Sequence, residues 1–260
     1  MSRQVIIDCS AESVERYRHG YAIVAVDVIR TTTTIATAVS LGRRCYPAAS
    51  LEAAQVLRAQ HPDSLCAGEQ SGEMPAGFDL NNSPAELALR TDTFRSLILL
   101  SSHGTKLIHA ARNCGAVYVA CLRNARFLSR YLAGLHSCVA VIGAGNYGEF
   151  REEDQICCAW IAGELLRSGF QPQDLNTNEM IARWEGKPIS SILCSKSVQY
   201  LRRTGQARDL AFILSHVADL EEVFQFDGEE VVMIAGDSQI TSRISAHSGA
   251  VLENRMEILD

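Results

Sequence analysis

The sequence predicts an α/β protein of three layers, α/β/α, with helices on both faces of a largely parallel or mixed sheet. Short apolar runs alternate with helical patterns through most of the 260 residues, which is typical of strand–helix–strand units. The runs are nearly continuous in Val, Ile and Leu, as expected of strands that are buried on both sides. Hydrophobic residues make up 47% of the chain, which is enough for a sizeable core.

Six segments are expected to be strands, because each is a short run of aliphatic or β-branched residues. These strands cover residues 3–8, 21–28, 44–49, 96–102, 116–122 and 138–144. Helices are expected at residues 31–42, 50–60, 83–90, 105–113, 124–134 and 152–169. The helix at 83–90 has the clearest start, since Ser83 fits an N-cap, Pro84 the first position and Glu86 the third.

The last part of the chain has a different pattern and is expected to form a small subdomain that completes the sheet. Polar stretches at 171–180 and 184–191 precede the patterned segments SILCSKSVQYLRR, RDLAFILSHV and EEVVMIA. We therefore expect an α/β core at residues 1–175 that bears the active-site loops. A C-terminal α/β subdomain at residues 176–260 is expected to pack on this core.

Composition and charge disfavour several classes of protein. The formal net charge is −6, and the sequence has no basic stripe of the kind found in nucleic-acid-binding proteins. The nine cysteines include no C-x-x-C pair, so we expect the reduced, buried thiols of a cytoplasmic protein. No signal-peptide pattern and no apolar run near the ~20 residues of a membrane span are present, so we expect a soluble protein without membrane contact. Whether the chain forms a homodimer stays open.

Four polar segments follow apolar runs, and three of them begin where an expected strand ends. They read DVIRTTTT, SSHGTK, GAGNYGEFREED and AGEQSGEMPAGFDLNNSP. Ligands of open α/β sheets bind beyond the carboxyl ends of the strands. We therefore expect these four segments to meet at one edge of the sheet and to form the functional site.

The GAGNYG segment has two interpretations. Gly143, Gly145 and Gly148 spell G-x-G-x-x-G between a strand and a helix, which matches a dinucleotide-binding fingerprint. The helix that follows opens with acidic residues that would repel a pyrophosphate, and no second strand ending in an acid follows it. A plain tight turn is the alternative, and an NAD(P)-binding oxidoreductase is the less favoured function.

Carboxylates from separate strand ends favour a divalent metal ion. Asp27, Glu69 and Asp154 are expected to converge, and Mg²⁺ prefers a few carboxylate oxygens together with water and phosphate oxygens. The acids that open the helix at 152–169 have a second interpretation, because acids also suit a helix N-terminus. The sequence has no H-x-x-H or H-E-x-x-H pairing, which disfavours zinc.

Hydroxyl groups and cations at the same strand ends indicate an anion pocket. Arg30 offers a planar fork of donors for phosphate or sulfonate, and Thr31–Thr34 lie where a helix N-terminus presents unpaired N–H groups. Gly104–Thr105 and Lys106 repeat this pattern in SSHGTK. Ser83 fits either substrate binding or helix capping alone. With Mg²⁺, such a pocket favours metal-assisted phosphoryl transfer or hydrolysis.

These motifs, in this order, resemble the 2-phosphosulfolactate phosphatase family. The resemblance rests on DVIRTTTTIATAV, GE, GFDLNNSPAE, SSHGTK and GAGNYG followed by EED, over residues 22–163. It implies a three-layer α/β fold with a mixed sheet and a Mg²⁺-dependent acid phosphatase. The implied reaction hydrolyses 2-phosphosulfolactate to sulfolactate and phosphate, on the way to coenzyme M or sulfolactate.

The family motifs map onto definite positions of this chain, and the chain departs from them at others. The matching positions are Asp27, Arg30, Thr32, Thr33, Thr34, Gly77, Phe78, Asp79, Asn82, Ser83, Glu86, Gly104, Thr105, Glu153 and Asp154. The departures include Gln70, Asn81 and His103, which fall in the expected anion pocket. Another phosphorylated small acid is therefore an alternative substrate. A non-catalytic binding protein for a phosphorylated or sulfonated small acid is the alternative function.

The sequence thus predicts a Mg²⁺-dependent phosphatase that acts on a small phosphorylated acid. We assign Asp27, Glu69 and Asp154 to the metal, and Asp27, Arg30, Thr32 and His103 to catalysis. Substrate binding is assigned to Thr31, Thr33, Asn82, Ser83, Gly104, Thr105, Lys106 and Asn146. His103 is either a proton donor to the leaving alkoxide or a hydrogen-bond donor in place of Asn. Direct attack by water and a phosphorylated protein intermediate both stay open.

Overall fold

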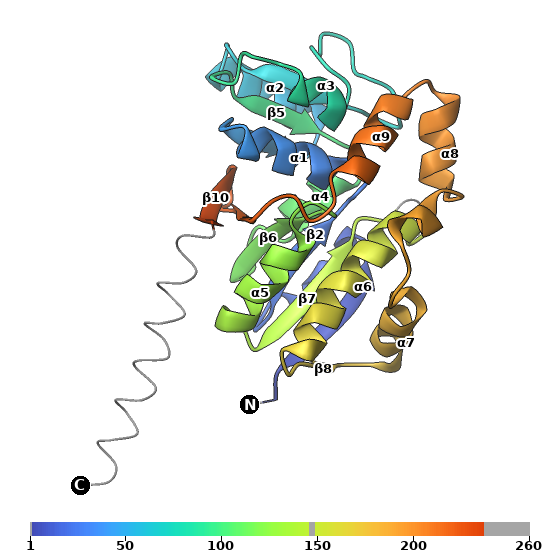
Figure 1. Cartoon of the computed structure of the whole chain (residues 1–260). Coiled ribbons are helices and arrows are strands. Elements are labelled where there is room, and N and C mark those ends of the chain that lie inside the picture. Colours follow the sequence, from blue (N-terminus) through green and yellow to red (C-terminus); the bar gives the residue numbers. More distant parts are fainter. Residues whose placement is uncertain (1, 146–148, 237–260) are drawn as a thin grey trace, which may run out of the picture.

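Ten strands form one mixed sheet in the structure, a computed structural model that describes residues 2–145 and 149–236 (Figure 1). The order across the sheet is β4-β5-β3-β10-β9-β6-β2-β7-β1-β8. The strands are β1 (Gln4–Cys9), β2 (Ala22–Val26), β3 (Cys45–Ala48), β4 (Leu65–Gly68), β5 (Leu97–Leu100), β6 (Ala116–Ala120), β7 (Cys138–Gly143), β8 (Gln171–Pro172), β9 (Glu222–Phe226) and β10 (Val231–Gly236). The predicted α/β class with a mixed sheet is confirmed.

Helices connect most of these strands. They are α1 (Thr31–Ser40), α2 (Leu51–Gln60), α3 (Pro84–Ala88), α4 (Gly104–Ala110), α5 (Ala125–Leu135), α6 (Glu152–Arg167), α7 (Leu175–Trp184), α8 (Lys196–Arg203) and α9 (Ala207–Ser215), with 3₁₀ helices η1 (Ala11–Tyr17) and η2 (Ile189–Ile192). Every strand and helix predicted before residue 170 is present with slightly different ends, whereas β4 was not predicted. Within the described part of the chain, no helix has the length and apolar character that a membrane span requires.

Two blocks of parallel strands are joined by an antiparallel pair from the C-terminal part of the chain. Strands β4, β5 and β3 are parallel to one another, and so are β6, β2, β7, β1 and β8. Between the blocks, β10 pairs antiparallel with β3 and β9, and β9 pairs antiparallel with β6. The C-terminal segment therefore completes the sheet at its centre.

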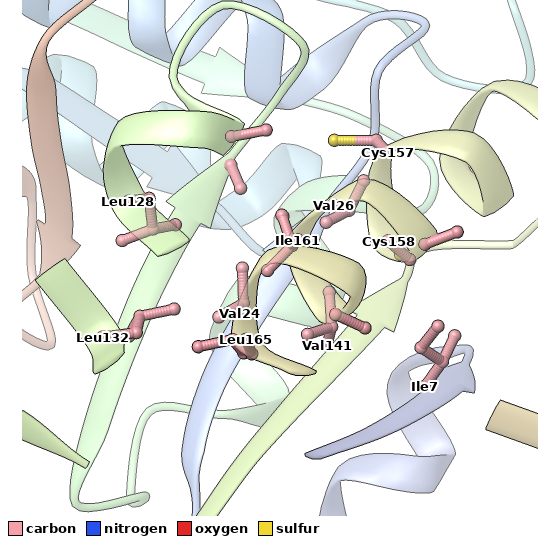
Figure 2. Close-up of a cluster of buried hydrophobic side chains, with 14 of the residues drawn as sticks. Ile7, Val24, Val26, Leu128, Leu132, Val141, Cys157, Cys158, Ile161 and Leu165 are labelled. Carbon is pink, nitrogen blue, oxygen red and sulfur yellow. The ribbon is translucent and has the colours of Figure 1, made fainter. Parts of the chain in front are cut away.

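Helices cover both faces of the sheet. On one face, α5, α6 and α7 pack against β1, β2, β6 and β7 in a cluster that includes Val24, Ile161 and Leu165 (Figure 2). On the other face, α1 and α4 share one hydrophobic cluster with both blocks of strands, including Ile23 of β2 and Leu99 of β5. Helix α2 covers the opposite side of β3, β4 and β5. The two blocks therefore share one core, which fixes the positions of their ends.

Helix α1 packs on one face of the sheet, across β3, β10, β9 and β6 (Figure 1). It is buried along nearly its whole length, from Thr31 to Val39. Its threonine hydroxyls donate to main-chain carbonyls, Thr33 to Val28 and Thr37 to Thr33, each at 2.8 Å. Such bonds satisfy hydroxyl groups that no water reaches. They explain how a row of threonines fits into a buried helix.

Leu165 of α6 is fully buried, so Leu165→Ala is expected to lower the free energy of unfolding by about 2–5 kcal/mol through the cavity that it leaves. Urea unfolding followed by circular dichroism measures this change. The matched control is Leu175→Ala, because Leu175 is 77% exposed, and it should change the free energy by about 0.5 kcal/mol or less. Equal losses in the two variants would contradict the core described here.

Candidate functional site

A cavity of about 380 Å³ opens beyond the carboxyl ends of β2, β4, β5 and β7, and its size suits a small ligand. Residues that follow these strands line it, together with residues from the start of α6 and from α8. The lining consists of Asp27, Ile29, Arg30, Thr31, Glu69, Ser71, Gly72, Asn82, Ser102, His103, Gly145, Arg151, Glu153, Asp154, Lys196, Ser197, Tyr200, Leu201 and Arg203. All four polar segments singled out in the sequence contribute to it.

Asp27 directly follows β2 and begins the turn into α1. Thr31 Oγ1 donates a 2.6 Å hydrogen bond to the Asp27 carboxylate, and Thr32 Oγ1 donates a 2.8 Å bond to the Asp27 carbonyl. Asp27 is 8% exposed, and its burial raises the pKa of its carboxyl group. The hydroxyls of this turn therefore hold a largely buried acid in the cavity wall.

The first turn of α6 supplies two more buried acids. Asp154 accepts a 2.8 Å hydrogen bond from the amide of Val28, which ties α6 to the end of β2. Burial, and then the charges of Asp27 and Glu153, raise the pKa of Asp154 well above its usual range. Glu153 is 1% exposed, burial raises its pKa, and its Oε2 atom has no hydrogen-bond partner among the described residues. Three crowded carboxyl groups thus face one cavity.

Glu69 follows β4 and is held by the turn after β5. Its carboxylate accepts hydrogen bonds from the Ser102 amide at 2.7 Å, the Ser102 hydroxyl at 2.8 Å and the Gly72 amide at 2.7 Å. These bonds fix the carboxylate and join two loops that are distant in sequence. Glu69 therefore lines the cavity in one defined orientation.

Arg30 is buried at the start of α1 and has partners of its own. Its Nη1 atom donates to Asp209 at 2.7 Å and to Gln206, and its Nη2 atom donates to Asn81 at 3.0 Å. Arg30 and Asp209 are both buried, so a neighbouring carboxylate neutralises much of the charge of Arg30. Arg30 thereby ties α9 and the turn before α3 to the end of β2.

The loop before α3 contributes one residue to the cavity and one to a helix cap. Asn82 lines the cavity, and its Oδ1 atom accepts a 2.7 Å hydrogen bond from Thr34. Ser83 lies outside the lining. Its Oγ atom accepts a 3.1 Å bond from the Glu86 amide at the start of α3 and donates a 2.6 Å bond to Asp209. The bond from the Glu86 amide is the capping role that was the second interpretation of Ser83, and the bond to Asp209 links this cap to α9.

The turn after β5 places Ser102 and His103 in the cavity lining. Gly104 follows as the first residue of α4 and packs against the end of β2. A Cβ atom at this position would collide with the Asp27 carboxylate and lie 2.6 Å from side-chain atoms of Thr31. Only a glycine allows the two turns to approach so closely.

Two glycines of GAGNYG are explained by local packing. A Cβ atom at Gly143 would collide with the ring of Phe150, and one at Gly145 would lie 2.7 Å from the sulfur of Cys9. Gly145 also has a φ of +65°, which side chains disfavour. The tight-turn interpretation therefore accounts for both positions, whereas Gly148 lies outside the described residues.

The sequence-predicted site residues fall into three groups. Those that line the cavity are Asp27, Arg30, Thr31, Glu69, Asn82, His103 and Asp154. Those outside its lining are Thr32, Thr33, Ser83, Gly104, Thr105 and Lys106. Among the latter, the threonine and serine hydroxyls bond to main-chain groups of the turns, and the Lys106 side chain is exposed. Asn146 lies outside the described residues.

One wall of the cavity comes from a helix that sequence reasoning did not assign to the site. Helix α8, next to α9 (Figure 1), is tied to the loop after β4 because Tyr200 donates a 2.7 Å hydrogen bond to the Gly72 carbonyl. No motif marks this helix, and its basic residues are the single sequence signal. Its cavity residues are Lys196, Ser197, Tyr200, Leu201 and Arg203.

No group of three or more His, Cys, Asp or Glu side chains within the described ranges is arranged to hold a metal ion. The cavity is nevertheless rich in charge, with carboxylates from the strand ends and α6, and cations from α8. Fold and site together define an α/β protein whose strand ends enclose a polar cavity suited to a small anionic ligand.

The chain belongs to the 2-phosphosulpholactate phosphatase family, whose model matches residues 9–223. A protein of Symbiobacterium thermophilum called "Probable 2-phosphosulfolactate phosphatase" is 32% identical over 74% of this chain and 86% of its own length. Proteins of the same name from Gloeobacter violaceus and Pseudothermotoga lettingae are 31% and 32% identical, over 73% and 74% of this chain and 81% and 84% of their own lengths. The family predicted from the motifs is therefore confirmed.

Gly104→Ala is expected to lower the free energy of unfolding by about 1–3 kcal/mol, because the added methyl group overpacks the contact with Asp27 and Thr31. Thermal unfolding followed by fluorescence measures the effect. The control is Gly134→Ala in α5, where a Cβ atom meets nothing within 4 Å, and it should be neutral or raise the free energy by up to about 1 kcal/mol. An unchanged Gly104→Ala variant would contradict the close packing of these turns.

Proposed function

We propose that this chain hydrolyses the phosphate ester of a small acid and that its substrate is 2-phosphosulfolactate. Its family is one of phosphatases. The observation on which the proposal depends is the cavity in which the buried Asp27 and Asp154 lie with amide, hydroxyl and cationic groups. Phosphoryl transfer needs positioning and compensation of charge around the phosphate. The products would be sulfolactate and phosphate, on the route to coenzyme M or sulfolactate.

Magnesium is the proposed cofactor because the donors of the cavity suit it. Asp27, Glu69 and Asp154 offer carboxylate oxygens, and Glu153 adds a buried oxygen atom with no hydrogen-bond partner in the described chain. Mg²⁺ in proteins commonly takes one or two carboxylates and completes its shell with water and substrate phosphate, so a closed cage of side chains is not required. When bound, Mg²⁺ would neutralise phosphate charge and lower the pKa of a water molecule.

The other cavity residues are proposed to bind and orient the substrate. The side-chain amide of Asn82 and the hydroxyl of Thr31 are polar groups of the lining that suit phosphate oxygens. His103 also lines the cavity, and we assign it to proton transfer to the leaving oxygen, because an imidazole is suited to that role. The Thr32 hydroxyl donates to a main-chain carbonyl outside the lining, so we assign it to shaping the turn and not to attack.

Asp154→Asn is expected to lower kcat for Mg²⁺-dependent hydrolysis of 2-phosphosulfolactate by about 100-fold or more, because it weakens a metal site that stabilises the transition state by several kcal/mol. It should also abolish the rise in Tm that Mg²⁺ is expected to give the wild type. Phosphate release and thermal unfolding with and without Mg²⁺ measure the two effects.

The matched control for this experiment is Glu152→Gln, an acid in the same turn of α6 that does not line the cavity. It should keep both the activity and the Mg²⁺-dependent shift in Tm. A shift that persists in Asp154→Asn and in Asp27→Asn would rule out the metal assignment. A wild type that hydrolyses no phosphorylated hydroxy acid would rule out the proposed reaction.

A further inference from the structure

Two of the four described Lys and Arg residues that line the cavity come from a different part of the chain than its carboxylates. Asp27 follows β2, and Glu153 and Asp154 open α6, whereas Lys196 and Arg203 belong to α8. Helix α8 is held in place by its buried Val198 and Leu201, which pack with Leu210 of α9, and by the bond from Tyr200 to Gly72. The basic side of the cavity is therefore built on a firmly packed helix.

These cations differ in how far other side chains neutralise them. Arg30 has a buried carboxylate partner, as described above. Arg151 and Lys196 share Glu149, at 2.8 Å and 2.5 Å. Arg203 also lines the cavity, but its guanidinium forms no hydrogen bond or ion pair with another residue of the described ranges. Its whole fork of donors is thus available to a ligand.

Arg151 provides a second donor of the same kind. Its side chain is 15% exposed, it lines the cavity, and its Nε atom is buried without a hydrogen-bond partner among the described residues. A buried donor without an acceptor destabilises a protein. Because Arg151 also lines the cavity, a shift of its side chain toward an acidic oxygen of a ligand would give this donor an acceptor.

We propose that Arg203, with Arg151, binds the acidic group of the substrate other than its phosphate, a sulfonate or a carboxylate, and thereby determines specificity. This inference rests on the proposed function, since it places two acidic groups of the same substrate at two sides of one cavity. The carboxylates that follow β2 and open α6 repel an acidic group of the substrate wherever no metal ion lies between them. The second acidic group is therefore stabilised only beside cations. An arginine fork matches the paired oxygens of a sulfonate or a carboxylate.

The test compares wild type and Arg203→Gln on three substrates that differ in acidic groups. 2-Phosphosulfolactate has a sulfonate and a carboxylate, 2-phospholactate has the carboxylate alone, and p-nitrophenyl phosphate has neither. Arg203→Gln is expected to lower kcat/KM for 2-phosphosulfolactate by about 10- to 100-fold more than for p-nitrophenyl phosphate, because a charge-assisted hydrogen bond is lost. The loss should lie mainly in KM. A comparable loss on 2-phospholactate identifies the carboxylate as the bound group, and a smaller one identifies the sulfonate.

Arg202→Gln is the matched control, because Arg202 is the preceding residue of the same helix and lies outside the cavity lining, where it donates to the Leu193 carbonyl at 3.3 Å. It should leave all three kcat/KM values unchanged. Arg203→Lys should recover only part of the lost selectivity, since it restores the charge without the fork. Equal losses of Arg203→Gln on all three substrates, or none, would overturn the proposal.

Titration calorimetry with sulfolactate separates this proposal from the proposed reaction, because the product binds without being turned over. Arg203→Gln should weaken sulfolactate binding by about 10- to 100-fold, and Arg202→Gln should not. If the wild type hydrolyses none of the substrates but Arg203→Gln binds sulfolactate more weakly than the wild type does, the proposed reaction is rejected and the binding site for the second acidic group is supported. Normal hydrolysis by the wild type with unchanged sulfolactate affinity in Arg203→Gln would reject the subsite alone.

Discussion

The structure depends above all on the burial of Asp27 and Asp154 beside one another at the end of β2. Carboxyl groups that lose water resist ionisation. Burial raises the pKa of both acids, the charge of Glu69 raises that of Asp27 further, and the charge of Asp27 raises that of Asp154. The surrounding chain is arranged to hold them nonetheless. Thr31 donates to Asp27, and the Val28 amide donates to Asp154. The start of α1 and the start of α6 are thus both fixed by the same pair of acids.

This constraint explains several features of the sequence near the cavity. The tight entry of α4 requires Gly104, because any side chain there would displace Asp27. Arg30 lines the cavity, but its guanidinium binds Asp209 and Asn81, which positions the loop of Asn82. The threonine hydroxyls of the first turn of α1 donate to the carbonyls of Asp27, Val28 and Arg30 in the turn before the helix. Much of the polar chemistry at these strand ends therefore holds the turns in place, and a smaller part faces the cavity.

Local patterns were sufficient to predict most of the fold, and seven of the nineteen described residues that line the cavity were assigned to the site from the sequence. Strands such as β2 and β7 are continuous apolar runs, which indicates a parallel sheet. In such a sheet, the polar segments that follow the strands meet at one edge. The place of β9 and β10 was not predictable, because their pairing with β6 and β3 joins segments more than a hundred residues apart. Strand β4, with the sequence LCAG, was not predicted because it contains no β-branched or aromatic residue, unlike the equally short β3 and β5.

The site residues that were missed have the same physical explanation. Arg203 and Tyr200 reach the cavity only because α8 packs on α9 and on the loop after β4, and no spacing in the sequence encodes that contact. Conversely, Ser83 and Thr105 match motif positions but bond to the main chain. Ser83 caps α3 by accepting from the Glu86 amide, and the Thr105 hydroxyl donates to the Ser101 carbonyl. Gln70, a departure from the family pattern, does not line the cavity.

The central position of β9 and β10 has a consequence for how the protein is made. A chain that emerges from the ribosome from its N-terminus presents both parallel blocks before the two strands that bridge them. Domains fold during synthesis at about 5–20 residues per second, so the nascent blocks would remain unbridged for seconds with their inner edges unpaired. An unpaired strand edge can form hydrogen bonds with a strand of another chain, which leads to aggregation. Chaperone protection during translation would therefore matter most for these two inner edges, on β3 and β6.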